Sequence, residues 1–254
     1  MDGEQRPVST PMADCSLCRF RSKTLLMGRC MPGDTCVMAE SGRQIDRFLR
    51  VNPFYAVLFL TDAFWERRAI AVRYAPLKAL LNVMTDEDEV VRRAVAFRLP
   101  PHQLLPMIDD PDREVRMTVA SRIELEHLEK LATDRDYIVR VTVAKRLPTG
   151  RLFRFIKDVD LEVRKVVAKR LPEMSLGLMI HDDSPEIRRI LAERMAPEDV
   201  SVLFNDDDWL VRYTAALRAN PDDLSGLADD PEPDVRALVH QRLNTAHPSG
   251  AENE

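Results

Sequence analysis

The chain has 254 residues, 31% of them charged and 45% hydrophobic, which is typical of one large or two small folded domains. Its 8 glycines and 6% aromatic residues argue against a β-sandwich or barrel, which needs many tight turns. No apolar run approaches the roughly 20 residues that span a bilayer, and residues 1–14 lack the apolar core of a secretory signal. We therefore predict a cytoplasmic protein without membrane association.

The charge is distributed unevenly along the chain. Residues 1–55 hold eight Lys/Arg and six Asp/Glu, a net charge of +2. The remaining residues hold 29 basic and 36 acidic side chains, a net charge of −7. Nucleic-acid binding draws on counterion release by Lys and Arg, so this acidic body argues against a nucleic-acid partner, although a local basic stripe would override the average.

All four cysteines lie near the N-terminus, as Cys15, Cys18, Cys30 and Cys36, with the spacing C-x2-C-x11-C-x5-C. A disulfide-stabilised secreted protein spreads its cysteines along the chain, whereas clustered cysteines in a reducing compartment indicate a metal. From spacing alone, a [4Fe–4S] cluster and a structural zinc ion are about equally supported. Two disulfides are the third alternative, and a cytoplasmic location argues against them.

Two features accompany the cysteines. Residues 31–34 read Met-Pro-Gly-Asp, which predicts a type II turn with Pro32 and Gly33 at its centre. The cations among the cysteines would offset the negative charge of either kind of tetrathiolate centre; they are Arg19, Arg21, Lys23 and Arg29.

Residues 41–51 predict a helix with an apolar face formed by Ile45, Phe48 and Leu49. It should end at Asn52-Pro53, because proline cannot continue a helix. We expect this helix to join the cysteine domain to the remainder of the chain and place the domain boundary near Asn52.

A repeat of 24 residues fills the rest of the chain. The dipeptide Val-Arg, replaced by Ile187-Arg188 in one unit, recurs at this step, with an Asp six residues before each Arg and another Arg six residues after it. The central arginines are Arg92, Arg116, Arg140, Arg164, Arg188, Arg212 and Arg236, and Asp62 with Arg68 extends the series by one step. Stacked repeats of this length predict a solenoid.

The unit at residues 110–133 shows the expected local structure. Asp110 is predicted to cap the N-terminus of a helix, with Pro111 at the first helical position. Val115, Val119 and Ile123 then form an apolar stripe of helical period. A second apolar pattern of barely two turns follows in each unit, so it must form a short α- or 3₁₀-type helix.

The recurrent Asp and Arg allow two interpretations. They could form a charged stripe for a partner, or a ladder that joins neighbouring repeats, which we favour because function rarely needs the same residue in every repeat. The two side chains lie about 240° apart around one helix. The Arg is therefore better placed to reach the Asp of a neighbouring repeat.

Little else in the sequence carries chemistry. The five histidines share no register, and no zinc-protease, phosphate-loop or serine-hydrolase motif is present. The acidic runs near residues 182, 206 and 222 fall at helix starts, where capping explains them better than a metal site does. Trp65 and Trp209 are interpreted as packing residues. We predict no enzymatic activity.

The sequence resembles the leucine-rich repeat variant protein family. The resemblance rests on the cysteine series, on Cys-Met-Pro-Gly-Asp-Thr-Cys at 30–36, on Ser-Gly-Arg-Gln-Ile-Asp-Arg-Phe at 41–48, and on the repeats. It implies an all-α, right-handed superhelical solenoid of alternating α- and short 3₁₀-type helices behind a small N-terminal iron–sulfur domain. It also implies a [4Fe–4S] cluster with Cys15, Cys18, Cys30 and Cys36 as its ligands.

On this basis we predict an iron–sulfur domain at 1–52, a solenoid of about eight repeats at 53–245, and a disordered tail at 246–254. The function we expect is a protein-interaction scaffold with an unidentified protein partner. Electron transfer or redox sensing by the cluster is the alternative, and nucleic-acid binding a weaker one. The binding surface should use helix positions that vary between repeats, namely Phe97, Ser121, Lys145, Lys169, Glu193 and Leu217.

Overall fold

The computed structural model describes residues 11–246. The predicted tail therefore lies outside the described residues except for Ala246, as do the first ten residues of the predicted iron–sulfur domain. The chain forms two compact units, Met1–His127 and Leu128–Glu254. The boundary predicted at residue 52 falls inside the first unit and stays a prediction.

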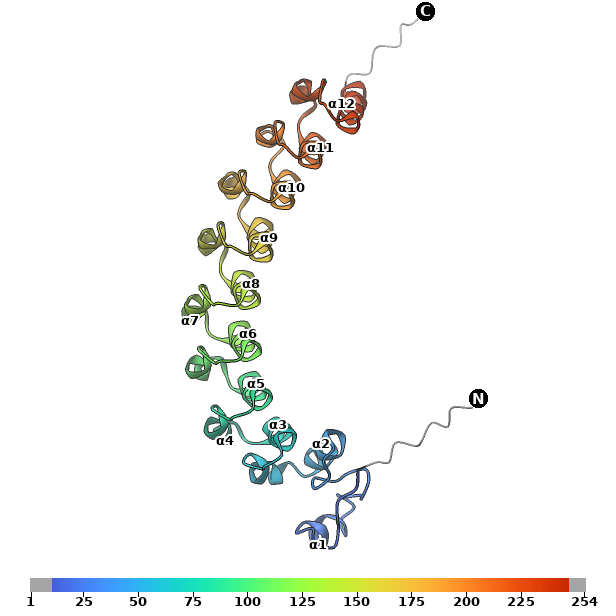
Figure 1. The fold of residues 1–254 in the computed structure, drawn as a ribbon, viewed down its shortest axis with the longest axis vertical. Coiled ribbons are helices and arrows are strands. Elements are labelled where there is room, and N and C mark those ends of the chain that lie inside the picture. The colour runs from blue at the N-terminus through green and yellow to red at the C-terminus, as the bar shows by residue number, and fades with distance from the viewer. Residues whose placement is uncertain (1–10, 247–254) are drawn as a thin grey trace, which may run out of the picture. The chain divides into compact units, whose positions relative to one another are not determined.

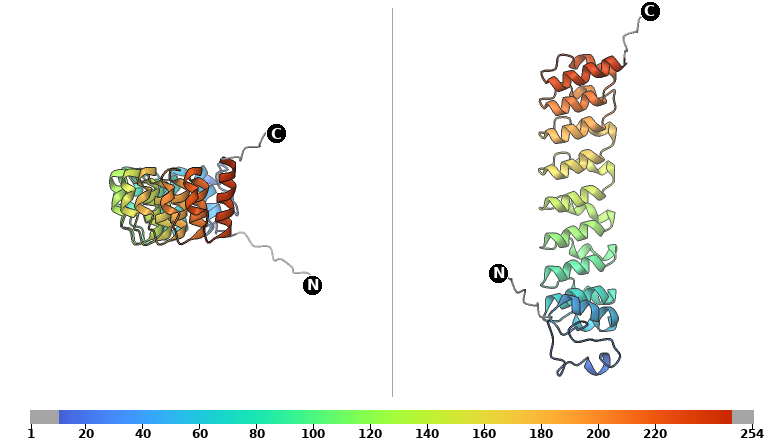
Figure 2. Two further views of the ribbon diagram at one scale, coloured as in Figure 1. Left: turned by 90° about the horizontal axis from the view of Figure 1, so that it is seen from above. Right: turned by 90° about the vertical axis from the view of Figure 1, so that its right-hand side faces the viewer.

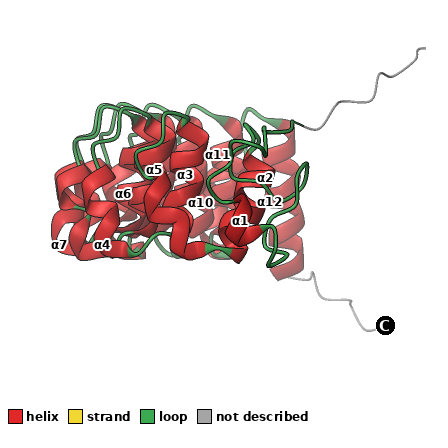
Figure 3. Cartoon of the chain, turned by 90° about the horizontal axis from the view of Figure 1, so that it is seen from below, coloured by secondary structure: helices red, strands yellow, loops and turns green. Residues whose placement is uncertain are grey.

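The described residues are helical apart from their connections, and their one β-bridge pairs Met31 with Thr35 (Figure 3). Among residues 11–246, no helix has the length and apolarity that crossing a bilayer requires. These observations confirm the predicted all-α class with its mixture of α- and 3₁₀-helices.

The first unit begins with the irregular cysteine segment, which contains the short helix α1 and is followed by α2 and η1 (Figure 1). Ten-residue helices then alternate with short ones, and α2, α3, α5 and α6 pack side by side. The elements are α1 (Arg21–Thr24), α2 (Gly42–Val51), η1 (Pro53–Phe59), α3 (Trp65–Tyr74), α4 (Leu77–Leu80), η2 (Leu81–Val83), α5 (Glu89–Arg98), η3 (Pro101–Gln103), η4 (Leu105–Met107), α6 (Arg113–Arg122) and α7 (Leu125–Leu128).

The second unit continues the same alternation, and its long helices α8 to α12 lie next to one another in sequence order (Figure 2). The short helices form a separate row along one side of the long ones (Figure 1). The elements are η5 (Glu129–Leu131), α8 (Tyr137–Arg146), η6 (Thr149–Phe155), α9 (Leu161–Arg170), η7 (Glu173–Met179), α10 (Pro185–Arg194), η8 (Val200–Leu203), α11 (Trp209–Arg218), η9 (Pro221–Leu227) and α12 (Pro233–Ala246).

The predicted apolar stripes form the core of each unit. Val115 and Val119 of α6 are fully buried, as are Val143 and Val167 of α8 and α9. The second apolar pattern faces them from the short helices, where Leu152 is also fully buried. Each repeat therefore contributes two apolar rows that only its neighbours can cover, which explains why the repeats stack.

The helix start predicted at Asp110 is wrong by two residues. Asp112 is the N-cap of α6, and its Oδ1 accepts hydrogen bonds from the backbone N–H groups of Glu114 at 2.9 Å and Val115 at 3.1 Å. Pro111 thus precedes the helix. The Asp110 carboxylate accepts hydrogen bonds from Arg92 and from the N–H of Asp112. It therefore stabilises a turn before the helix, and Asp112 caps the helix instead.

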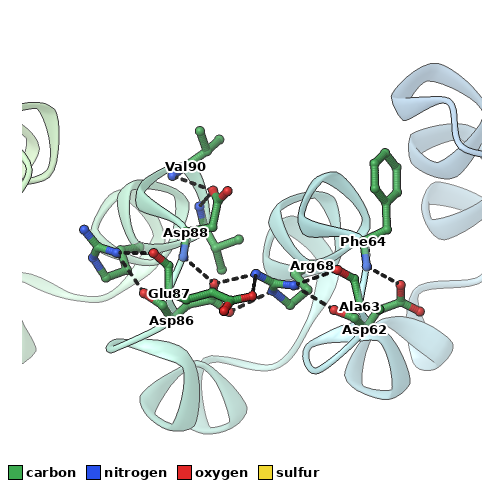
Figure 4. Close-up of polar contacts among 10 residues, drawn as sticks. Asp62, Ala63, Phe64, Arg68, Asp86, Glu87, Asp88 and Val90 are labelled. Atoms are coloured by element: carbon green, nitrogen blue, oxygen red, sulfur yellow. Dashed lines mark hydrogen bonds and ion pairs between the residues drawn. The ribbon is translucent and has the colours of Figure 1, made fainter.

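The predicted ladder between repeats is confirmed. Figure 4 shows its first step, in which Arg68 donates from Nε and Nη2 to the two carboxylate oxygens of Asp86, both at 2.9 Å. Arg68 Nη1 also donates to the carbonyl of Asp62 in its own repeat at 2.8 Å. Each Asp partner lies 18 residues after its Arg: Asp110 for Arg92, Asp158 for Arg140, Asp182 for Arg164, Asp206 for Arg188 and Asp230 for Arg212.

The second arginine of each repeat forms another ladder, which the sequence did not predict. Arg194 donates to the carbonyls of Ala168 in α9 and, at 2.7 Å, of Leu171 just after it. The last carbonyls of a helix have no partner within the helix, and the Leu-Pro that follows cannot supply an N–H at the proline. An arginine of the next repeat donates the hydrogen bonds that these carbonyls would otherwise lack. The same pattern joins Arg122 to Ala96 and Leu99, and Arg242 to Ala216 and Ala219.

Candidate metal centre

The four cysteines predicted as ligands lie around one pocket. Cys15, Cys18, Cys30 and Cys36 all line it. Cys36 is buried, whereas the other three are partly exposed. The pocket therefore lies just below the surface of the cysteine segment.

The turn between Cys30 and Cys36 reverses the chain, so that both cysteines line the pocket. The N–H of Asp34 donates to the carbonyl of Met31 at 3.1 Å, and Gly33 has a φ of +79°. This is the predicted turn with glycine at its third position, where a side chain would strain the backbone. The bridge between Met31 and Thr35 closes the loop beneath it.

Two buried amides hold the cysteine segment, Gln44 in α2 and Asn52 directly after it, and this role was not predicted from the sequence. Gln44 Nε2 donates to the carbonyl of Pro11 at 2.7 Å, and its own backbone carbonyl accepts from the N–H of Cys36 at 3.2 Å. Asn52 Nδ2 donates to the carbonyl of Arg29 at 2.8 Å, next to Cys30. The sequence contained a sign of this role. Residues 44, 48 and 52 fall on one helical face, which places two polar side chains beside Phe48 in an apolar stripe.

An aromatic cluster joins the cysteine segment to α2 and η1. Phe20 is buried, with its ring centroid 5.9 Å from that of Phe48, 4.9 Å from that of Tyr55 and 5.5 Å from that of Phe59. Phe20 follows the second cysteine by two residues. Its burial therefore ties the N-terminal cysteine pair to α2 and η1.

The electrostatic setting of the pocket favours a positively charged centre. Burial raises the pKa of the Cys30 thiol, and the nearby Cys36, Cys18 and Cys15 raise it further. A thiol that resists ionisation becomes a stable thiolate when a metal binds it. Of the four cations noted in the sequence, Arg21 lines the pocket, whereas the Arg19 guanidinium lies 4.8 Å from the centre of the Phe20 ring.

The chemistry of the donors fits an iron–sulfur cluster. The four sulfur atoms are the soft ligands that iron–sulfur clusters and zinc prefer. The rest of the lining is largely apolar, including Ala13, Leu25 and Met38. The one carboxylate in the lining, Asp14, accepts hydrogen bonds from the N–H and hydroxyl of Ser16 at 2.8 and 2.6 Å. An apolar lining of this kind limits the access of solvent to the centre on the side that it covers.

Within residues 11–246, the acidic runs, histidines and tryptophans that the sequence offered as other possible sites do not line this pocket. Asp208 caps α11, as expected for the acidic runs. His127 lies beside Glu124 and Glu126, but the two acids are exposed and His127 is only partly buried. Trp65 and Trp209 are 42% and 37% exposed, so neither is a core residue.

Comparisons with known proteins agree with this site. Residues 11–57 match the family profile described as LRV protein FeS4 cluster, a match that spans all four cysteines and indicates an iron–sulfur cluster. A protein of Rhodobacter capsulatus, described as an uncharacterized 27.7 kDa protein in the nifB 3′ region, is 36% identical over 87 residues. That alignment covers 34% of this chain and 35% of the relative, so the chain matches about a third of that relative's length.

A solved structure extends the similarity to the repeats. It is described as a leucine-rich repeat variant with a novel repetitive protein structural motif, and it shares 57% sequence identity with this chain at a TM-score of 0.86. The alignment covers 92% of this chain and all of the other. The chain belongs to the leucine-rich repeat variant family, with an N-terminal iron–sulfur domain joined to helical repeats.

Proposed function

We propose that this protein is a non-catalytic scaffold that binds a protein partner along its repeats and carries a [4Fe–4S] cluster on Cys15, Cys18, Cys30 and Cys36. Such a cluster supplies a cross-link between distant cysteines and a centre for one-electron transfer. The chain supplies the four thiolates, the turn at Gly33, and the amides of Gln44 and Asn52 that hold the loops in place.

The observation that carries the scaffold proposal is a contrast between two kinds of repeat position. The Asp, Arg, Val and Ala positions repeat almost unchanged, and their side chains stack one repeat on the next. The position after the core alanine changes from repeat to repeat, and it is exposed in each of the six repeats compared: Phe97, Ser121, Lys145, Lys169, Glu193 and Leu217. A side chain that stacking does not constrain is free to serve recognition.

The shifted pKa values of one ladder pair have a structural cause. Catalytic groups with perturbed pKa values usually gather in a cleft. Here the lowered pKa of Asp230 and the raised pKa of Arg212 arise mainly from the hydrogen bonds that these two residues make with each other. Both therefore reflect contacts between repeats.

Charge reversal on the recognition face tests the proposal. The cluster-loaded chain with Lys145→Glu and Lys169→Glu should lose specific proteins that the unmodified chain captures from a cell extract, as identified by mass spectrometry. A matched control reverses Lys130 and Lys157, which are exposed and lie on or beside the short helices. Equal capture by all three proteins would contradict a role for this face.

Electron transfer is the second candidate, because three of the four cysteines are partly exposed. The surrounding surface is basic at Arg21, Lys23 and Arg29 and apolar at Leu17 and Leu26, which are 84% and 87% exposed. Both features suit transient docking of an electron-transfer partner. Voltammetry of the loaded protein should then give a reversible couple within the biological range, with the cluster intact afterwards. A cluster that decomposes on reduction would exclude this role.

A further inference from the structure

The last two long helices form an open groove between them. Trp209, Leu210 and Tyr213 of α11 and Leu238 of α12 line one hollow of about 480 Å³. Tyr213, Leu238 and Leu217 line a second, of about 570 Å³, which shares residues with the first. Together they follow α11 from its first turn to its last.

The groove exposes large apolar side chains. Trp209 and Leu210 are each 37% exposed, and Leu217 is 48% exposed. The rings of Trp209 and Tyr213 lie edge to face with their centroids 6.4 Å apart. Aromatic and leucine side chains that stay exposed in neighbouring turns of one helix are typical of a binding surface.

The segment that forms the groove carries a net negative charge, and the charged residues that line the groove itself are Asp234 and Arg242. Residues 196–246 hold eleven Asp/Glu and four Arg, and no Lys, a net charge of −7. Arg212 binds Asp230, and the other three arginines (Arg218, Arg236 and Arg242) donate to backbone carbonyls. All four are thus used within the repeats. Asp234 lines the groove, and its carboxylate has no ion pair within the described part of the chain.

We infer that this groove binds a basic segment of a protein partner, in which Lys or Arg side chains alternate with apolar ones. The cationic groups pair with Asp234 and lie against Trp209 and Tyr213, since cations are attracted to the faces of aromatic rings. The apolar side chains fill the hollows beside Leu217 and Leu238. This inference rests on the proposed scaffold function and specifies the chemistry of its partner.

The dimensions and the charge both favour such an occupant. A ten-residue helix such as α11 is about 15 Å long, which matches four or five residues of extended peptide. The chain's own residues 247–254 carry two Glu and no Lys or Arg, so their charge has the same sign as that of the groove segment and disfavours their binding there. A second copy of the groove would bring two net-negative surfaces together, which argues against self-association.

Peptide binding to the full, cluster-loaded chain tests the inference. The probe is a fluorescein-labelled ten-residue peptide with four Arg and two Leu among Gly and Ser, and the control peptide has Glu in place of each Arg. Fluorescence anisotropy should show binding of the basic peptide alone, weakened by added salt. Trp209→Ala combined with Tyr213→Ala should weaken it at least tenfold.

Two further variants make the test specific. Asp234→Asn, at an exposed position in the first turn of α12, should weaken binding while lowering the unfolding temperature only slightly. Trp65 occupies the same repeat position as Trp209 in the other unit and is similarly exposed, so Trp65→Ala should leave binding unchanged. Equal losses in Trp65→Ala and Trp209→Ala would overturn the inference.

Three other outcomes would also overturn it. They are no binding of the basic peptide, binding only after residues 247–254 are removed, and a dimer in sedimentation that Trp209→Ala dissolves. These failures are distinguishable from failure of the scaffold proposal. If the groove fails while the Lys145 and Lys169 variant still loses its partners, the scaffold function stands and its partner has another chemistry.

Discussion

Asp158 shows what a single ladder residue contributes. Arg140 donates to both of its carboxylate oxygens at 2.8 Å, and the N–H of Asp160 adds a third bond at 2.9 Å. The Asp158 and Arg140 side chains are only 8% and 11% exposed. Removing the Asp158 carboxylate leaves the Arg140 guanidinium with little contact to solvent and without its ion-pair partner.

Asp158→Ala should therefore lower the free energy of unfolding by about 2–3 kcal/mol. Chemical denaturation followed by circular dichroism measures this change. Glu173→Ala is the control, because Glu173 is exposed at the start of η7 and should cost less than about 0.5 kcal/mol. Equal, small effects of the two changes would show that the ladder does not hold the repeats together.

The ladder also predicts a dependence of stability on pH. The hydrogen bonds from Arg212 lower the pKa of Asp230, against the opposing effect of burial. A carboxyl group with a lowered folded-state pKa stabilises the fold above its unfolded pKa of about 3.9, and this stability is lost as the pH falls through the folded value. The unfolding temperature should thus fall between about pH 5 and pH 3. The fall should be smaller in Asp230→Asn, and an equal fall would contradict the assignment.

At the scale of the helix, each C-terminus depends on an arginine from the next repeat. Arg194 serves α9 by donating to the carbonyls of Ala168 and Leu171. Arg194→Met keeps the apolar stem but leaves both carbonyls without their donor, so we expect a loss of about 1–3 kcal/mol in the free energy of unfolding. Denaturation of Arg189→Met, a partly exposed arginine of the same helix, is the control and should show a much smaller change.

The helices themselves were predictable because their stripes and prolines are local signals. Val115, Val119 and Ile123 set the period, and Leu-Pro marks the end of several helices. The start was not predictable, because Asp110 and Asp112 are both good caps by residue type. The contact of Arg92 with Asp110 decides between them. The sequence predicted this contact between repeats, but it did not show that the contact leaves the helix cap to Asp112.

The sequence predicted the four cysteines that line the pocket but not the residues that hold their segment in place. Cysteine spacing pointed to all four thiols of the pocket. Gln44 and Asn52 were missed because a polar residue in an apolar stripe fits either a buried contact or an imperfect stripe. Their partners are the backbone carbonyls of Pro11 and Arg29, which lie 33 and 23 residues away in the chain.

At the scale of the whole molecule, the repeats should not depend on the cluster for their stability. Cys30→Ser should abolish or greatly weaken cluster binding, because serine is a poor ligand for iron in these clusters. The helical circular-dichroism signal should largely survive, since the repeats bury their own apolar rows. A variant that loses most of its helical signal would show instead that the cluster is needed for the repeats to fold.

The central claim is that the four N-terminal cysteines hold a [4Fe–4S] cluster, and the iron and sulfide content of the protein tests it most directly. Protein purified without oxygen should be brown and contain about four iron and four acid-labile sulfide per chain. The Cys15→Ser and Cys36→Ser variants should contain little of either. A colourless protein that holds one zinc ion per chain would contradict the claim.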